Sequence, residues 1–104
     1  LHGPLPDRAG LDAYVRVLDQ LRGSREIEWI CAPSGLGSPA EVEALVRAAV
    51  ELGGHIRVGV GDNPVAARGR SNRELVEQVV KIAGEHGRVP ARPRDLLERF
   101  GRAA

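Results

Sequence analysis

The chain is poor in several residue types, and each shortage removes a class of protein. Its 104 residues include one cysteine, Cys31, so neither an internal disulfide nor a cysteine-rich metal site can form. Lys81 is the only lysine among fifteen basic residues, and the net charge of +1 leaves no clustered basic surface for nucleic acid. No apolar run approaches the roughly 18 residues of a membrane span, and no signal-peptide pattern is visible. We therefore expect a cytoplasmic protein without nucleic-acid or membrane partners.

Aromatic residues are also scarce, at 3% of the chain, whereas hydrophobic residues make up 42%. The core must therefore be built from Val, Leu, Ile and Ala. The length is that of one small domain. The chain begins with Leu1 rather than Met, which indicates a processed, trimmed or excerpted sequence.

Helical periodicity and capping residues predict four helices. The first follows an irregular start over residues 1–9 and extends from Leu11 to a stop at Gly23. Capping boxes at Ser38 and Ser71, each with a glutamate three positions later, begin the next two helices. A short last helix is expected around residues 96–100. The breaks that separate these later segments are Gly53, Gly54, Gly87, Pro90 and Pro93.

Two short segments between the helices have the composition of strands. Residues 27–32 are rich in β formers, and residues 55–60 carry β-branched side chains. Strands separated by helices of 12–15 residues pair in parallel through right-handed crossovers, which predicts an α/β fold. Two strands alone make a poor sheet, so the chain looks incomplete as a fold. Trp29 and Cys31 fall within the first strand and are expected in the core.

The segment 53–63, Gly-Gly-His-Ile-Arg-Val-Gly-Val-Gly-Asp-Asn, is the most informative part of the sequence. Arg57 interrupts an apolar strand, where a guanidinium is costly unless it meets an anion or a hydrogen-bonded partner. Asp62 follows at the carboxyl end of that strand, the edge at which open α/β sheets and βα barrels place their sites. The pattern predicts a cation and a carboxylate at one active edge; an ordinary ion pair is the alternative.

This segment resembles the last barrel strand of the β-keto acid cleavage enzymes, the family of 3-keto-5-aminohexanoate cleavage enzyme. The family version runs Gly-Gly-His-Val-Arg-Val-Gly-Leu-Glu-Asp-Asn. The resemblance extends from about residue 27 to residue 101 and includes an Asn-x-Glu-Leu-Val helix opening at 72–76. It implies a partial (β/α)8 TIM barrel, in which the last two βα units and their flanking helices form one partial domain over residues 1–104. A full βα barrel takes about 250 residues.

The resemblance implies an acyltransferase-type cleavage, in which a 3-keto acid and acetyl-CoA give acetoacetate and a new acyl-CoA. Arg57 would stabilise a developing oxyanion and orient the carboxylate, and Asp62 would be a general base. The loop after the first strand would contact substrate, because glycines and a helix amino terminus can approach a phosphate of the acyl-CoA. A tight glycine turn is the alternative. The expected substrate-binding residues are Ser34, Gly35, Gly37, Ser38 and Asn63.

The resemblance also implies a catalytic zinc held by two histidines of an early strand and a glutamate of the last. The His-x-His strand is absent from this sequence, and Gly61 stands where the family has its glutamate. A catalytic zinc takes about three protein ligands, and His2, His55 and His86 lie at unrelated spacings. We therefore expect this chain, a fragment or degenerate member, to bind no zinc and to be inactive alone. The intact family is expected to be homo-oligomeric.

A second interpretation starts from the same glycine loop. Gly35-x-Gly37-x-x-Ala40 after a strand matches a relaxed dinucleotide fingerprint, and Asp62 falls near the place of a ribose-binding acid. The chain would then be a non-catalytic α/β nucleotide-binding module, which leaves Arg57 unexplained. A third possibility is a truncated product without activity that is stable through self-association of its sheet edges.

Overall fold

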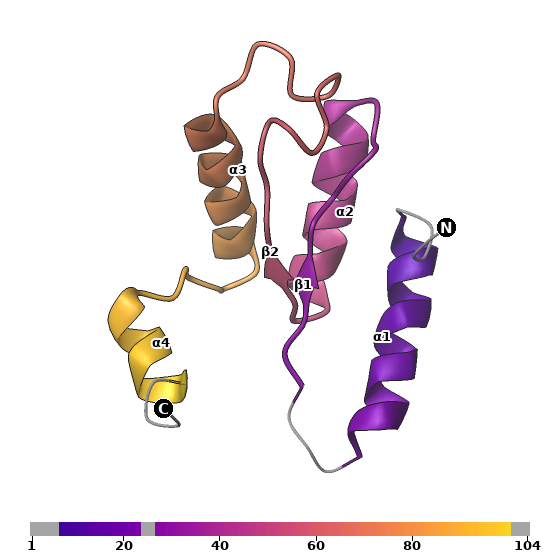
Figure 1. Ribbon diagram of the computed structural model, residues 1–104, viewed down its shortest axis with the longest axis vertical. Coiled ribbons are helices and arrows are strands. Elements are labelled where there is room, and N and C mark those ends of the chain that lie inside the picture. Colours follow the sequence, from indigo (N-terminus) through magenta and orange to yellow (C-terminus); the bar gives the residue numbers. More distant parts are fainter. Residues whose placement is uncertain (1–6, 24–26, 101–104) are drawn as a thin grey trace.

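The computed structural model describes residues 7–23 and 27–100 and contains the predicted order of elements (Figure 1). The helices and strands in chain order are α1 Arg8–Arg22, β1 Ile30–Cys31, α2 Pro39–Glu51, β2 His55–Ile56, α3 Asn72–Glu85 and α4 Pro93–Phe100. No helix in these two described ranges has the length and apolar content to cross a membrane.

The two strands pair in parallel, as predicted, but both are much shorter than expected. Ile30 lies opposite His55, and Cys31 lies opposite Ile56. The predicted strand extents of 27–32 and 55–60 were wrong, and Val60 already lies in a turn. A strand extends only where a neighbouring strand supplies backbone hydrogen-bond partners. Among the described residues, each of the two strands has one neighbouring strand.

The helix starts follow the local capping signals closely. The Asp7 side chain accepts a hydrogen bond from the Gly10 N–H at 2.8 Å, so α1 begins at Arg8 rather than at residue 11. The expected irregular start is therefore wrong for residues 8 and 9, and residues 1–6 lie outside the described ranges. At α2 and α3, Ser38 and Ser71 accept from the N–H three positions later, each at 3.2 Å, as the capping boxes predict.

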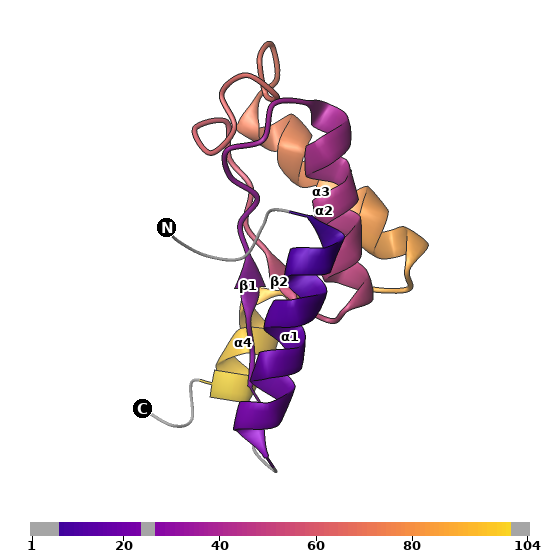
Figure 2. The ribbon, with the colours of Figure 1, turned by 90° about the vertical axis from the view of Figure 1, so that its right-hand side faces the viewer.

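Helices α1, α2 and α3 cover one face of the two strands (Figure 2). Helix α2 is central and contacts both neighbouring helices and β2. Trp29 and Cys31 pack, partly buried, against the α1–α2 core, as expected, and α2 and α3 share a second core. The buried members of the two cores are Leu11, Leu36, Leu45, Ala48 and Ala49, and Val46, Val50 and Ile82.

Alternate residues of a pleated strand point to opposite faces, and no helix in the described part of the chain covers β1 on the second face. Ile30 on that face is 68% exposed, whereas Cys31 is partly buried beneath the helices. His55 on the same open face bonds to the Glu28 carboxylate at 2.7 Å, and Arg99 of α4 reaches the same carboxylate. The hydrogen bond from His55 and the charge of Arg99 lower the pKa of Glu28 despite an opposing effect of burial.

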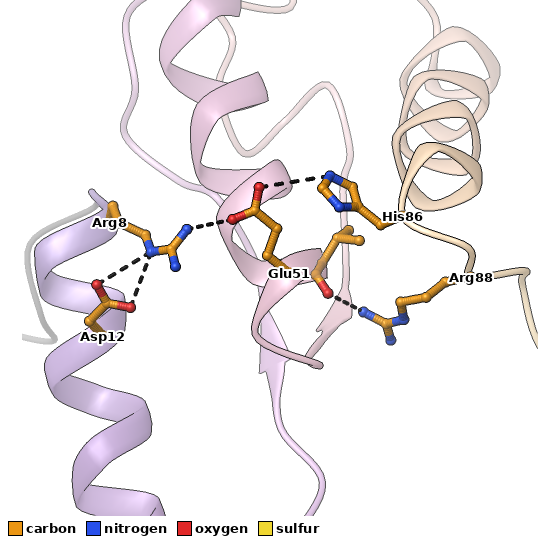
Figure 3. A network of polar contacts seen from close by, with 6 residues as sticks. Arg8, Asp12, Glu51, His86 and Arg88 are labelled. Carbon is orange, nitrogen blue, oxygen red and sulfur yellow. Dashed lines mark hydrogen bonds and ion pairs between the residues drawn. The ribbon is translucent and has the colours of Figure 1, made fainter.

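A polar network joins the three helices near the end of α2 (Figure 3). The Arg8 guanidinium of α1 donates to Glu51 at 2.7 Å and also pairs with Asp12 at 3.1 Å. Glu51 lies 3.8 Å from the His86 ring, and Arg88 donates to the Val50 carbonyl at 2.9 Å. The Val50 carbonyl, one of the last of α2, thus accepts a second bond besides that from the Gly53 N–H. This network lies at the other end of β2 from the segment that carries Arg57 and Asp62.

Candidate functional site

Arg57 and Asp62 meet where the chain leaves β2, as the sequence predicts. An Nη of Arg57 lies 3.2 Å from an Oδ of Asp62. The Arg57 side chain is 69% exposed and the Asp62 side chain 24% exposed, so the pair faces solvent. A turn from Gly59 to Asp62, closed by a 3.2 Å backbone bond, brings the carboxylate back toward the strand. The pair therefore combines a planar cation with a carboxylate that can accept a proton.

Asn63 follows Asp62 in the chain and joins the two loops of the site. Its side-chain oxygen accepts from the Leu36 N–H at 2.8 Å, and its amide donates to the Pro33 carbonyl at 2.7 Å. The Gly35 N–H adds a 3.2 Å bond to the Asp62 carbonyl. Asn63 is only 6% exposed, and these buried bonds hold the loop after β1 against the loop after β2. Its expected contact with substrate stays a prediction.

Asn72, the first residue of α3, holds a third segment at the site. Its side-chain oxygen accepts from the Val60 N–H at 2.9 Å. An added Cβ on Gly59 would lie 3.8 Å from that oxygen and 3.5 Å from an oxygen of Asp62, so the turn is closely surrounded. The sequence predicts Asn72 only as part of a helix opening. The bond from the Val60 N–H joins residues twelve positions apart, and no local sequence signal indicates it.

Hydrogen bonds to other residues of the chain hold most of the loop over residues 34–38 in place. Gly35 takes φ of +73°, a conformation that favours glycine. The Gly35 N–H donates to the Asp62 carbonyl, and the Leu36 N–H donates to the side-chain oxygen of Asn63. The Ser38 hydroxyl accepts from the backbone N–H of Glu41. The Glu41 carboxylate also accepts from that hydroxyl at 3.0 Å, which places negative charge at the start of α2. Phosphate binding by Ser34, Gly35, Gly37 and Ser38 stays a prediction, with this carboxylate acting against it.

The residues of the two described ranges do not fit a catalytic zinc. No group of three His, Cys, Asp or Glu side chains in the described part of the chain could hold a metal ion. Position 61 offers no ligand, and an added Cβ there would meet nothing within 4 Å. His55 bonds to Glu28, and His86 lies near Glu51; the third histidine, His2, lies outside the described residues. Burial raises the pKa of the Cys31 thiol, which disfavours the thiolate that binds metals.

The fold and the site define a class of protein: a parallel βαβ unit with a paired arginine and carboxylate at the carboxyl end of its second strand. A sequence model described as beta-keto acid cleavage enzyme matches residues 2–101. The chain belongs to the β-keto acid cleavage enzyme family.

Two curated relatives agree with this family assignment. The chain is 39% identical over 95 residues to the 3-keto-5-aminohexanoate cleavage enzyme of Acetoanaerobium sticklandii, a match that covers 88% of this chain and 34% of the relative. It is 50% identical over 48 residues to the 3-keto-5-aminohexanoate cleavage enzyme of Fusobacterium nucleatum subsp. nucleatum, covering 43% of this chain and 18% of that relative. The chain thus spans about a third of the first relative. The predicted resemblance is confirmed, and the nucleotide-binding alternative is not favoured.

Proposed function

We propose that the chain is the carboxyl-terminal part of a βα barrel and that it supplies part of an acyl-transfer site. In the complete barrel, a 3-keto acid and acetyl-CoA would give acetoacetate and a new acyl-CoA. The observation that carries this proposal is the 3.2 Å Arg57–Asp62 pair at the end of β2 in a member of the β-keto acid cleavage enzyme family. The parallel pair, with helices on one face and an open face opposite, supports a piece of a barrel wall.

Arg57 would bind the carboxylate of the keto acid and stabilise negative charge on a carbonyl oxygen. Its guanidinium presents several N–H donors in a fixed plane, and only one of its nitrogens is used in the bond to Asp62. Donors fixed in this way are worth most where charge develops during the reaction. The 69% exposure of the side chain leaves room for an anionic substrate beside it.

Asp62 would accept a proton from the bound keto acid or from its adduct with the acyl group. Its carboxylate lies beside the guanidinium that would hold the substrate, so base and substrate would be close together. Asn63 and the loop residues Ser34, Gly35, Gly37 and Ser38 would shape the neighbouring surface for the substrate. The bonds from Asn63 to both loops would keep that surface fixed.

No step of this proposal uses a metal, because the described residues do not supply a zinc site. If the complete family site holds zinc, its ligands must come from outside the described residues of this chain. A cytoplasmic location and a homo-oligomeric state stay predictions. The isolated 104 residues should be inactive, since they span only a third of the first relative. The test is acetoacetate formation from acetyl-CoA and a panel of 3-keto acids, and clear turnover by the isolated chain would refute the prediction.

The roles of the two residues are best tested in a complete barrel. We suggest replacing the matching third of the Acetoanaerobium sticklandii enzyme with this chain and adding Gly61→Glu. This substitution restores the glutamate that the family resemblance places at position 61, where a side chain has open space. If this chimera cleaves 3-keto acids, Arg57→Lys and Asp62→Asn should each lower kcat about 100-fold or more. Arg73→Ala changes an 87% exposed side chain on α3 and should leave kcat unchanged. An active chimera that tolerates Asp62→Asn would exclude this carboxylate as the base.

A further inference from the structure

The turn over residues 59–62 carries the Asp62 carboxylate, and little within the turn itself holds it. One backbone bond closes it, from the Asp62 N–H to the Gly59 carbonyl at 3.2 Å. Glycines at positions 59 and 61 allow many backbone conformations. A Cβ added at Gly61 would meet no atom within 4 Å, so packing does not fix that part of the turn either. The direction of the carboxylate therefore depends on contacts from other segments.

Two hydrogen bonds from other segments hold the turn, one near each end. At its last residue, the Asp62 carbonyl accepts from the Gly35 N–H at 3.2 Å. Near its start, the Val60 N–H donates to the side-chain oxygen of Asn72 at 2.9 Å. In the described part of the chain, no other hydrogen bond joins residues 59–61 to another segment. The Asn72 side chain thus determines where the first half of the turn lies.

Asn72 is suited to this task because α3 holds it firmly. It is the first residue of α3 and follows the N-cap Ser71, whose hydroxyl accepts from the Glu74 N–H at 3.2 Å. The chain runs upward from β2, crosses a loop at the top of the view and enters α3 there (Figure 1). Leu75 and Ile82 anchor the helix in the interior, at 7% and 2% exposed. A side chain on an anchored helix holds its polar group more firmly than one on a loop.

The two oxygens of the Asp62 carboxylate have different surroundings. Oδ1 accepts from an Nη of Arg57 at 3.2 Å. Oδ2 makes no hydrogen bond to another residue of the described ranges, and it lies 3.5 Å from the position of a Cβ added at Gly59. The Asn72 oxygen lies 3.8 Å from the same position, so this oxygen and Oδ2 border one part of the turn. Oδ2 is therefore the oxygen left to take a proton, and Asn72 bonds to the backbone that directs it.

We propose that Asn72 is a positioning residue for Asp62. By holding the Val60 N–H, its side-chain oxygen fixes the turn, and the turn aims Oδ2 at the keto acid that Arg57 would bind. Asn72 makes no hydrogen bond to the carboxylate itself, so it acts through the backbone. The inference rests on the proposed role of Asp62 as the base. A displacement of about 1 Å in a reacting group can cost about 100-fold in rate, so the bond to Val60 should influence the reaction.

The first test is amide hydrogen exchange in the 104-residue chain, followed by NMR. Asn72→Ala should speed exchange of the Val60 N–H about tenfold, because the acceptor is lost, and exchange of the Asp62 N–H should rise with it. Asn72→Asp keeps an oxygen in the same place and should keep both rates close to those of wild type. Arg73→Ala, the same truncation at the next position of α3, is the control. Circular dichroism checks that each variant folds. Unchanged exchange at Val60 and Asp62 in a folded Asn72→Ala variant would overturn the proposal.

The second test uses the chimera of this chain with the Acetoanaerobium sticklandii enzyme. Asn72→Ala should lower kcat about 10-fold to 100-fold and change KM for the keto acid by less than about twofold, because Arg57 keeps its place. Asn72→Asp should return kcat to within about threefold of the parent chimera, since the oxygen is what holds Val60. An equal loss of kcat in both variants would overturn the proposal, because the amide nitrogen would then be the group that acts. A change confined to KM would overturn it as well.

The Asp62→Asn chimera separates this inference from the proposed function. If Asp62→Asn lowers kcat and Asn72→Ala does not, the positioning role is refuted and the proposed base stands. If Asp62→Asn is tolerated, the proposed base is refuted, and the positioning role that rests on it is refuted too. If the chimera is inactive, the exchange rates at Val60 and Asp62 decide, because they require no catalysis.

Discussion

At the scale of single residues, Asn63 connects the two loops of the site. It donates to Pro33 and accepts from Leu36, and it is almost completely buried. Each buried polar group left without a partner costs about 1–3 kcal/mol. The position of Asp62 relative to the loop after β1 therefore depends on this amide side chain and on the backbone bond from Gly35 to Asp62.

Substitution of this amide tests its role. Asn63→Ala should lower the free energy of unfolding by about 2–4 kcal/mol, because both backbone groups lose their partner in a buried place. Asn72→Ala is the matched control, since its oxygen also accepts from a backbone N–H but in an exposed setting, and it should cost about 1 kcal/mol. Urea titrations followed by circular dichroism give both values. Equal costs for the two variants would contradict the role assigned to Asn63.

At the scale of elements, the junction between α2 and β2 depends on close packing against Trp29, the residue before β1. An added Cβ on Gly54 would collide with the indole ring of Trp29, approaching Cε3 to 2.7 Å. The ring belongs to the partly buried layer over the α1–α2 core. Gly54 thus lets β2 start beside Trp29, whereas Gly61 lies in open space.

These two glycines give opposite predictions for the same substitution. Gly54→Ala should lower the free energy of unfolding by about 1–3 kcal/mol, because the ring must move out of a packed layer. Gly61→Ala should leave the free energy unchanged or raise it by up to about 1 kcal/mol, because it restricts the unfolded chain and meets no atom. Thermal unfolding of both variants at one protein concentration measures the difference. A Gly54→Ala variant as stable as wild type would contradict the contact.

The elements also show what local signals in a sequence can predict. Asp7, Ser38 and Ser71 each bond to an amide three residues later, so a short window of sequence contains the information needed for a helix start. Strand lengths were overestimated because a ladder depends on its partner strand, which local composition does not report.

The same distinction applies to the site. Arg57 and Asp62 are five residues apart and were correctly predicted to meet. The bonds of Asn63 to Leu36 and Pro33 join residues 27 and 30 positions apart, and nothing in the local sequence signals that pairing. The family resemblance drew attention to Asn63 but suggested a substrate contact rather than a connection between loops.

At the scale of the whole molecule, Glu51 connects three helices through Arg8 and His86. The hydrogen bond from Arg8 lowers the pKa of Glu51 below its ordinary 4.5, against a smaller effect of burial. Other carboxyls with a lowered pKa in the described part of the chain are Glu28, Glu85 and Asp95.

Stability should therefore fall in acid. Between the ordinary pKa and the lower pKa of the folded state, the unfolded chain binds more protons, so stability increases with pH in that window. The contribution of Glu51 is fully present above the ordinary value of 4.5 and is lost as the pH falls through the folded pKa. Tm measured from about pH 6 to about pH 3 should decrease, and Glu51→Gln should show a shallower decrease. Glu77→Gln, on the exposed side of α3, is the control, and a slope unchanged by Glu51→Gln would contradict the assignment.

Trp29 is the only tryptophan in the chain, and its ring lies over Gly54 where α2 passes into β2. Its fluorescence therefore reports on one identifiable place in the fold. A shift of the emission maximum toward longer wavelength would show water reaching that junction, without any added label. The scarcity of aromatic residues thus provides a built-in optical probe of the contact between the two strands.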